Sequence, residues 1–201
     1  MIHYTAITNS NEPLFQGLEA VGELLAAREQ SYSCIIAGGA SLAAHGILKR
    51  VTGDVDVMAV RDENGAITLA PEVFPQFVAL AIGEVAREFN LPSGWMNTQM
   101  ATGLRAGMPP GFAERLTWRQ YGGLSAGFVG RPDLIALKLE AASDDPPHGR
   151  SDVHLADLIA LGASPAELDN AALWVNDVNV DPRRNETISW VKRYVAEHSR
   201  S

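Results

Sequence analysis

The sequence predicts an α/β protein in which a small mixed sheet is flanked by helices and followed by further helices near the C-terminal end. Two observations carry this prediction. Residues 34–60 read as a strand, a glycine turn, a short helix and a second strand. Apolar residues recur at helical spacing on both sides of that stretch, over residues 12–30 and 71–90. A chain of 201 residues suits one domain, so we expect a core over residues 1–150 and a helical cap over residues 151–201 packed on it.

The remaining elements follow from local signals in chain order. Pro13 suits the first turn of the first helix, and residues 124–129 read as a later strand. An apolar helix is predicted over residues 132–142, and Ser151 can begin the next one. A further helix starts at the capping box Ser164-Pro165-Ala166-Glu167, and the last helix starts at Asp181-Pro182.

The first strand ends in paired glycines. Residues 34–37 form an apolar run of strand length, and Gly38 and Gly39 follow it directly. Ser41 then opens a helix-compatible segment and can cap it. The sequence therefore predicts a glycine turn between a buried strand and the start of a short helix.

The second strand carries two acids on one face. Asp54 and Asp56 alternate with Val55 and Val57, and alternate residues of a strand point to the same side. Paired carboxylates are suitable ligands for a hard divalent cation, which phosphates also coordinate. Backbone N–H groups in a turn that opens a helix attract phosphate. The pattern favours a site for a metal-bound phosphate, although a tight turn followed by an edge strand with solvated acids would give the same residues.

These residues resemble the nucleotidyltransferase superfamily, whose fold is related to that of DNA polymerase beta. The resemblance is to small bacterial members, the AbiEii-type toxins and the minimal nucleotidyltransferases, and it covers roughly residues 30–175. It implies that Gly38, Gly39 and Ser41 contact a nucleoside triphosphate and that Asp54 and Asp56 bind Mg²⁺ or Mn²⁺.

The same resemblance extends to the later helices. It implies that Lys138, embedded in the apolar helix, contacts a phosphate, and that Asp152 or Asp157 completes the site. The alternative is structural: Asp152 is an exposed capping acid, Asp157 pairs with His154 three residues before it, or Lys138 is a packing partner of Asp157.

The chain departs from the superfamily pattern in one place. Many members carry a third carboxylate on a later core strand, but residues 124–129 contain no acid. The general base is therefore unassigned, with Asp152 and Asp157 as candidates.

Composition limits the partners. The formal net charge of −8 argues against a large nucleic-acid surface, although Arg105, Arg115 and Arg119 are either solvated or line a local phosphate groove. No apolar run is long enough to span a membrane, and Met1–Thr5 lacks the features of a secretion signal, so we expect a cytoplasmic protein. The single Cys34 lies in an apolar run and reads as a buried residue.

We expect a metal-dependent nucleotidyltransferase that transfers a nucleoside monophosphate from a nucleoside triphosphate to an acceptor hydroxyl on RNA, protein or a small molecule. Two alternatives remain open. One is a nucleotide-binding module with weak or no turnover, which the missing third acid favours. The other is a toxin–antitoxin component that acts through contact with a partner protein.

Overall fold

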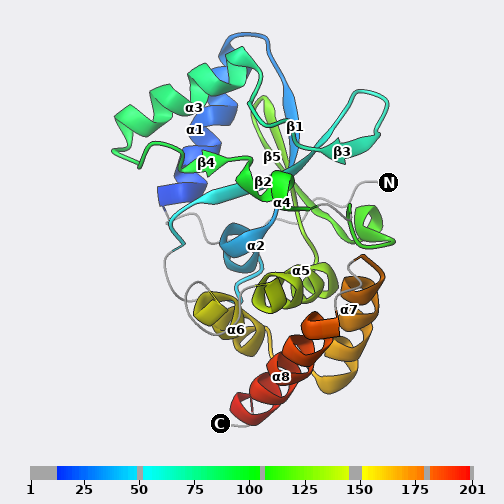
Figure 1. Cartoon of the computed structure of the whole chain (residues 1–201). Coiled ribbons are helices and arrows are strands. Elements are labelled where there is room, and N and C mark those ends of the chain that lie inside the picture. Colours follow the sequence, from blue (N-terminus) through cyan, green and yellow to red (C-terminus); the bar gives the residue numbers. More distant parts are fainter. Residues whose placement is uncertain (1–12, 49–51, 105–106, 145–150, 179–181, 200–201) are drawn as a thin grey trace. The chain divides into compact units, whose positions relative to one another are not determined.

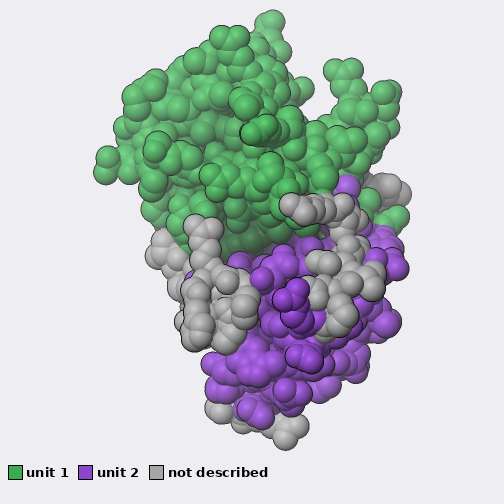
Figure 2. Space-filling view, in the orientation of Figure 1, with its two compact units in different colours: residues 1–104, 113–129 green, residues 105–112, 130–201 purple. Residues whose placement is uncertain are grey.

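The computed structural model describes residues 13–48, 52–104, 107–144, 151–178 and 182–199. The chain forms two compact units (Figure 2): unit 1 comprises residues 1–104 and 113–129, and unit 2 comprises residues 105–112 and 130–201. The structure confirms the mixed α/β fold class, since a mixed sheet and helices make up the described chain. The domain boundary expected at residue 150 stays a prediction, because a compact unit need not fold on its own.

Unit 1 contains the sheet and the helices that pack on it (Figure 1). Its elements in chain order are α1 (Pro13–Ala27), β1 (Tyr32–Ile36), α2 (Gly38–Ala44), β2 (Val55–Arg61), β3 (Ile67–Leu69), α3 (Gln76–Glu88), β4 (Met96–Asn97), α4 (Gln99–Gly103), β5 (Thr117–Tyr121) and β6 (Leu124–Phe128). A short 3₁₀ helix, η1 (Phe112–Arg115), precedes β5.

The sheet is mixed. Its strand order in the described residues is β3-β2-β1-β6-β5, and β4 pairs with β2 beside this path. The β1–β6 and β2–β4 pairs are parallel, whereas β1–β2, β2–β3 and β5–β6 are antiparallel. The central strand β1 is therefore bordered by β2, which carries Asp56, and by β6.

Helix α1 packs on this sheet through the apolar stripe that its sequence predicted. Leu18, Val21 and Leu25 are fully buried, and α1 contacts β5, β6 and α3, which lies beside it (Figure 1). Gly22 allows the closest approach: its carbonyl accepts a 2.8 Å hydrogen bond from Gly123 N–H, and a Cβ at position 22 would overlap the backbone of the β5–β6 turn.

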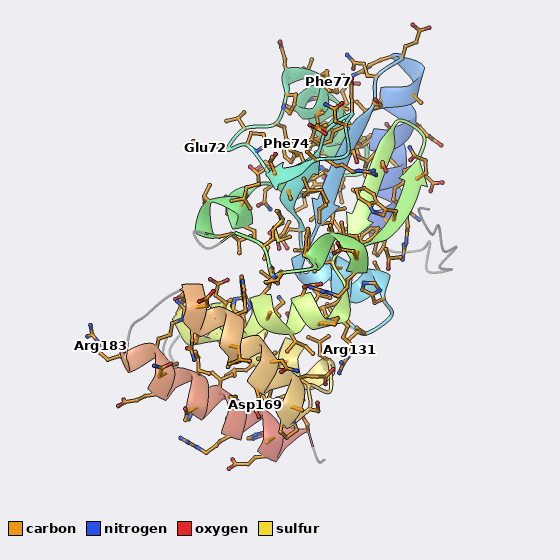
Figure 3. The ribbon with its side chains drawn as sticks, turned by 90° about the vertical axis from the view of Figure 1, so that its right-hand side faces the viewer. Glu72, Phe74, Phe77, Arg131, Asp169 and Arg183 are labelled. Carbon is orange, nitrogen blue, oxygen red and sulfur yellow. The ribbon has the colours of Figure 1, made fainter. Side chains whose placement is uncertain are left out.

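Aromatic side chains pack at the start of α3. Phe74 and Phe77, labelled in Figure 3, contact the Tyr32 ring edge-on, with ring centroids 6.3 and 6.4 Å away. Trp95 is buried, and its indole N–H donates a 3.3 Å hydrogen bond to the Ile82 carbonyl of α3.

Unit 2 is helical in its described residues after position 130. Its helices are α5 (Arg131–Asp144), α6 (Ser151–Ala160), α7 (Pro165–Val178) and α8 (Pro182–His198). Helix α5 is buried along most of its length and contacts the other three. Arg131, labelled in Figure 3, donates to the Leu161 carbonyl and pairs with Glu167 of the predicted capping box. Arg131 thus ties the start of α5 to the α6–α7 connection.

The structure corrects two boundaries. Ser41 does not cap its helix, because α2 begins at Gly38 and has no side-chain cap. The helix expected from residue 71 begins at Gln76, since Pro75 is its N-cap and the residue before a proline avoids helical backbone angles. The sequence did not reveal β3, β4 or β5.

Candidate functional site

The glycine turn joins the end of β1 to the start of α2. Gly38 has a positive φ of 62°, a conformation that costs most residues energy but is open to glycine. Ala37, just before it, donates its backbone N–H to the Asp56 carbonyl over 2.9 Å. The turn is therefore attached directly to the strand that carries Asp56.

The Asp56 side chain also lies against the turn. A Cβ built on Gly38 would overlap Asp56 Oδ2, so a side chain at position 38 would displace the carboxylate from this point. Asp56 lies in β2 and is half-buried, between the buried neighbours Val55 and Val57. The structure thus brings together two predicted site residues that are far apart in the sequence.

Asp54 lies immediately before β2 and is exposed. The exposure alternates as predicted, since Val55 is fully buried between Asp54 and Asp56. Asp54 and Asp56 follow the alternation that puts both side chains on one side of the strand.

Gly39 makes a different contact from the one expected for phosphate binding. A Cβ at this position would overlap the side chain of Thr52, which is buried. The Thr52 side chain therefore packs closely against Gly39, the second glycine of the turn. Sequence reasoning missed Thr52, because a single threonine before Gly53 carries no pattern.

Ser41 is fully buried inside α2. Its hydroxyl donates to the Ile36 carbonyl over 2.5 Å and accepts the Val129 N–H over 3.1 Å. These bonds tie α2 to the ends of β1 and β6. They commit the hydroxyl to the protein backbone, so the predicted contact between Ser41 and a triphosphate stays a prediction with no geometric support here.

The short strand β4 borders the acids on the other side. Asp56 is the register partner of Asn97, and Val55 N–H donates to the Trp95 carbonyl over 2.6 Å. Asn97 Oδ1 accepts the backbone N–H of Gln99 over 3.0 Å. A two-residue strand is too short for alternation to reveal it in the sequence.

In unit 2, Lys138 and Asp157 form a buried ion pair. Lys138 Nζ lies 2.7 Å from Asp157 Oδ2, and the Asp157 side chain is fully buried. This contact matches the packing alternative raised for the two residues. Asp152 belongs to α6, and its side chain lies outside the described part of the structure.

The three arginines considered for a phosphate groove differ in their environments. Arg119 is half-buried: it donates to the Ala44 carbonyl at the end of α2 over 2.6 Å, and its guanidinium lies 4.8 Å from the Phe128 ring centroid. Arg115 is half-buried in η1. Arg105 lies outside the described residues.

A family model described as "nucleotidyltransferase of unknown function (DUF6036)" matches residues 13–161. The chain belongs to this family. A search of curated proteins and a search of solved structures both find no match. The nucleotidyltransferase resemblance is thereby confirmed at the level of the superfamily, whereas the narrower likeness to AbiEii-type toxins stays a prediction.

The matched range of this nucleotidyltransferase-family protein contains every predicted site residue, from Gly38 to Asp157. Within the described ranges, no three His, Cys, Asp or Glu side chains gather where they could hold a metal ion. The described residues also contain no helix that is long and apolar enough to cross a membrane.

Proposed function

We propose that this protein transfers a nucleoside monophosphate from a nucleoside triphosphate to an acceptor hydroxyl, with a divalent cation held by Asp54 and Asp56. One observation carries the proposal. The Asp56 carboxylate lies directly against Gly38, so a phosphate received by the glycine turn would come within reach of the acids. Membership of the nucleotidyltransferase family supports the same reaction class.

The donor set fits Mg²⁺ or Mn²⁺. Both side chains offer hard oxygen ligands, and Mg²⁺ is commonly held by one or two carboxylates together with substrate phosphates. When bound, the cation would neutralise negative charge on the phosphates. Asp54 is exposed and Asp56 half-buried, so a nucleotide-bound cation could reach the pair from solvent.

The chain's own residues would then supply binding and orientation. The backbone of the Gly38–Gly39 turn would receive the triphosphate, because neither glycine places a side chain between phosphate and the N–H groups. Lys138 would balance charge that develops on the phosphates, as the superfamily resemblance implies. Asp152 and Asp157 remain the candidates for the general base.

The first experiment measures nucleotide binding. Calorimetry with Mg²⁺ and a nonhydrolysable triphosphate should detect binding to the wild type and its loss in Asp56→Asn. Glu63→Gln is the matched control, since it removes one exposed negative charge from the same unit. Equal binding by Asp56→Asn and the wild type would place the site elsewhere.

The second experiment measures turnover. Each labelled triphosphate is incubated with the protein, Mg²⁺ and cellular RNA or lysate, and transfer of label to RNA, protein or a small molecule identifies the acceptor. Label transfer by the wild type that is abolished in Asp54→Asn or Asp56→Asn would support the proposed nucleotidyltransferase activity.

A nucleotide-binding module without turnover is the second candidate. The acid-free strand β6 favours it, as does the lack of a three-residue acidic cluster in the described chain. Binding without label transfer to any acceptor would support this module. The toxin–antitoxin role and the cytoplasmic location rest on the sequence alone, and co-expression with a neighbouring reading frame would test the former.

A further inference from the structure

Val129, the residue after β6, has both of its backbone polar groups bound by side chains of α2 and of its C-cap residue His45. Its N–H donates to Ser41 Oγ over 3.1 Å and to the Ile36 carbonyl over 3.1 Å. Its carbonyl accepts a 2.9 Å hydrogen bond from His45 Nε2. Ser41 and His45 are four residues apart and therefore lie on one face of the helix.

Helix α2 depends on tertiary contacts for its direction, and all seven of its residues are buried. It spans seven residues, begins with two glycines and has no side-chain N-cap. A helix this short is unstable by itself, and glycine lowers its stability further. Tertiary contacts must therefore hold it. Besides the burial of its residues, these include the two bonds to Val129 and the bond from Arg119 to the Ala44 carbonyl.

The direction of α2 sets the position of the glycine turn. Gly38 and Gly39 are the first two residues of the helix, so a rotation of α2 on β6 would move Gly38 relative to the Asp56 carboxylate that lies against it. In enzymes a shift of about 1 Å in a reacting group can lower the rate by about 100-fold. The placement of α2 consequently bears on the site and not only on stability.

We propose that Ser41 and His45 are positioning residues that lock α2 onto Val129 and so keep the Gly38–Gly39 turn in register with Asp56. This inference rests on the proposed function for its catalytic consequence. It gives the buried Ser41 hydroxyl a role that needs no contact with nucleotide. It also gives His45 a role that the sequence did not reveal, because the partner is a backbone group 84 residues away.

The test compares two replacements of His45, which is half-buried and so tolerates substitution. His45→Gln keeps a side-chain N–H that can reach the Val129 carbonyl, whereas His45→Leu has none. Ser41→Ala removes the other bond and keeps the test decisive if His45→Leu does not fold. Val85→Ala, in the buried face of α3, is the control for a general loss of stability.

The first readout needs no nucleotide. Amide hydrogen exchange of residues 37–44 should quicken at least about tenfold in His45→Leu and Ser41→Ala, because local opening exposes these amides, and stay near wild type in His45→Gln and Val85→Ala. Unchanged exchange in both His45→Leu and Ser41→Ala would overturn the proposal, whether or not the protein binds nucleotide.

The second readout uses the activity of the folded variants. Under saturating nucleotide, label transfer by His45→Leu should fall about 10- to 100-fold and recover in His45→Gln. A loss that Val85→Ala reproduces at equal thermal stability would show that the bonds serve stability alone, and would overturn the positioning role. Failure of the wild type to bind nucleotide would count against the proposed function, and the exchange measurement would still decide the question of the α2 lock.

Discussion

Gly38 is the residue at which the site leaves least room for change. Replacement by alanine puts a Cβ into the Asp56 carboxylate and forces a positive φ of 62° on a residue with a side chain. The backbone term alone costs about 1–2 kcal/mol, and the overlap adds to it. Gly38→Ala should therefore lower the free energy of urea unfolding by more than that amount and abolish nucleotide binding.

Gly46 provides a matched control for this prediction. Its φ is 70°, yet nothing lies within 4 Å of a Cβ at that position. Gly46→Ala should show the backbone cost alone and keep nucleotide affinity. If the two alanine variants lose equal stability and bind nucleotide equally, the contact between Gly38 and Asp56 does not shape the site.

Residue roles were the least predictable part of the site. The sequence identified Gly38 and Asp56 through the resemblance, and the structure brings them into contact. For Gly39 the expected neighbour was phosphate, but the nearest side chain is Thr52. The polar bonds of Ser41 and the Asn97 register depend on long-range pairing, which a single sequence does not encode as a pattern.

At the scale of elements, the buried pair of Lys138 and Asp157 links α5 to α6. Removal of one member of a buried ion pair costs about 3–5 kcal/mol, because it leaves the other charge buried without its counter-ion. Lys138→Met should therefore lower the free energy of unfolding by about that amount in a urea titration. A lysine with a purely catalytic role would instead leave the free energy of unfolding nearly unchanged when replaced.

The double variant Lys138→Met/Asp157→Leu separates packing from chemistry. Replacing both charges with apolar side chains is often neutral for stability, so we expect stability to recover. Label transfer should stay lost if Lys138 acts on the triphosphate, as the resemblance implies. Recovery of both stability and label transfer would assign the lysine to packing alone.

The start of α7 should make stability depend on pH. Hydrogen bonds from Arg131 and Ser164 lower the pKa of Glu167 from its usual value of 4.5 to about 2. A carboxyl whose pKa falls on folding stabilises the folded state above the unfolded pKa, and this stabilisation disappears as pH falls. The thermal midpoint should therefore decrease between about pH 4.5 and pH 2.

Glu167→Gln isolates this contribution. The amide cannot ionise, so the variant should be less stable than wild type near neutral pH and should lose less stability over the same acid range. Because the side chain is partly exposed, salt should weaken the difference between the two proteins. Parallel acid profiles for both proteins would exclude Glu167 as the cause.

The sequence located best the helices that have an apolar stripe over several turns or a clear capping motif. The stripe of α1 is buried as predicted, and the capping box of α7 forms both of its reciprocal bonds. Strands β3 and β4 contain three and two residues, which is too short for alternation to be recognised. Tertiary pairing, and not local preference, makes them strands.

For the whole molecule, the sequence predicted the α/β class and a mixed sheet, and the structure has both. It did not predict that α5 groups with the later helices. Helix α5 is buried along most of its length. The sequence of such an apolar helix predicts burial but does not indicate which elements surround it. That partition depends on which helices contact α5, namely α6, α7 and α8.

The reactivity of the buried Cys34 thiol can be used to measure the unfolding of unit 1 separately from that of unit 2. Burial at the centre of β1 raises its pKa to about 12, so neither the thiolate nor access for a reagent is available while unit 1 is folded. Because the chain has one cysteine, the rate of disulfide exchange with an aromatic reagent should report the opening of unit 1 alone. Trp174 and Trp190 lie in unit 2, and variants that retain only these tryptophans would report that unit by fluorescence. Coincident urea midpoints for the thiol and the fluorescence would mean that the two units unfold as one, whereas separate midpoints would make each a cooperative unit.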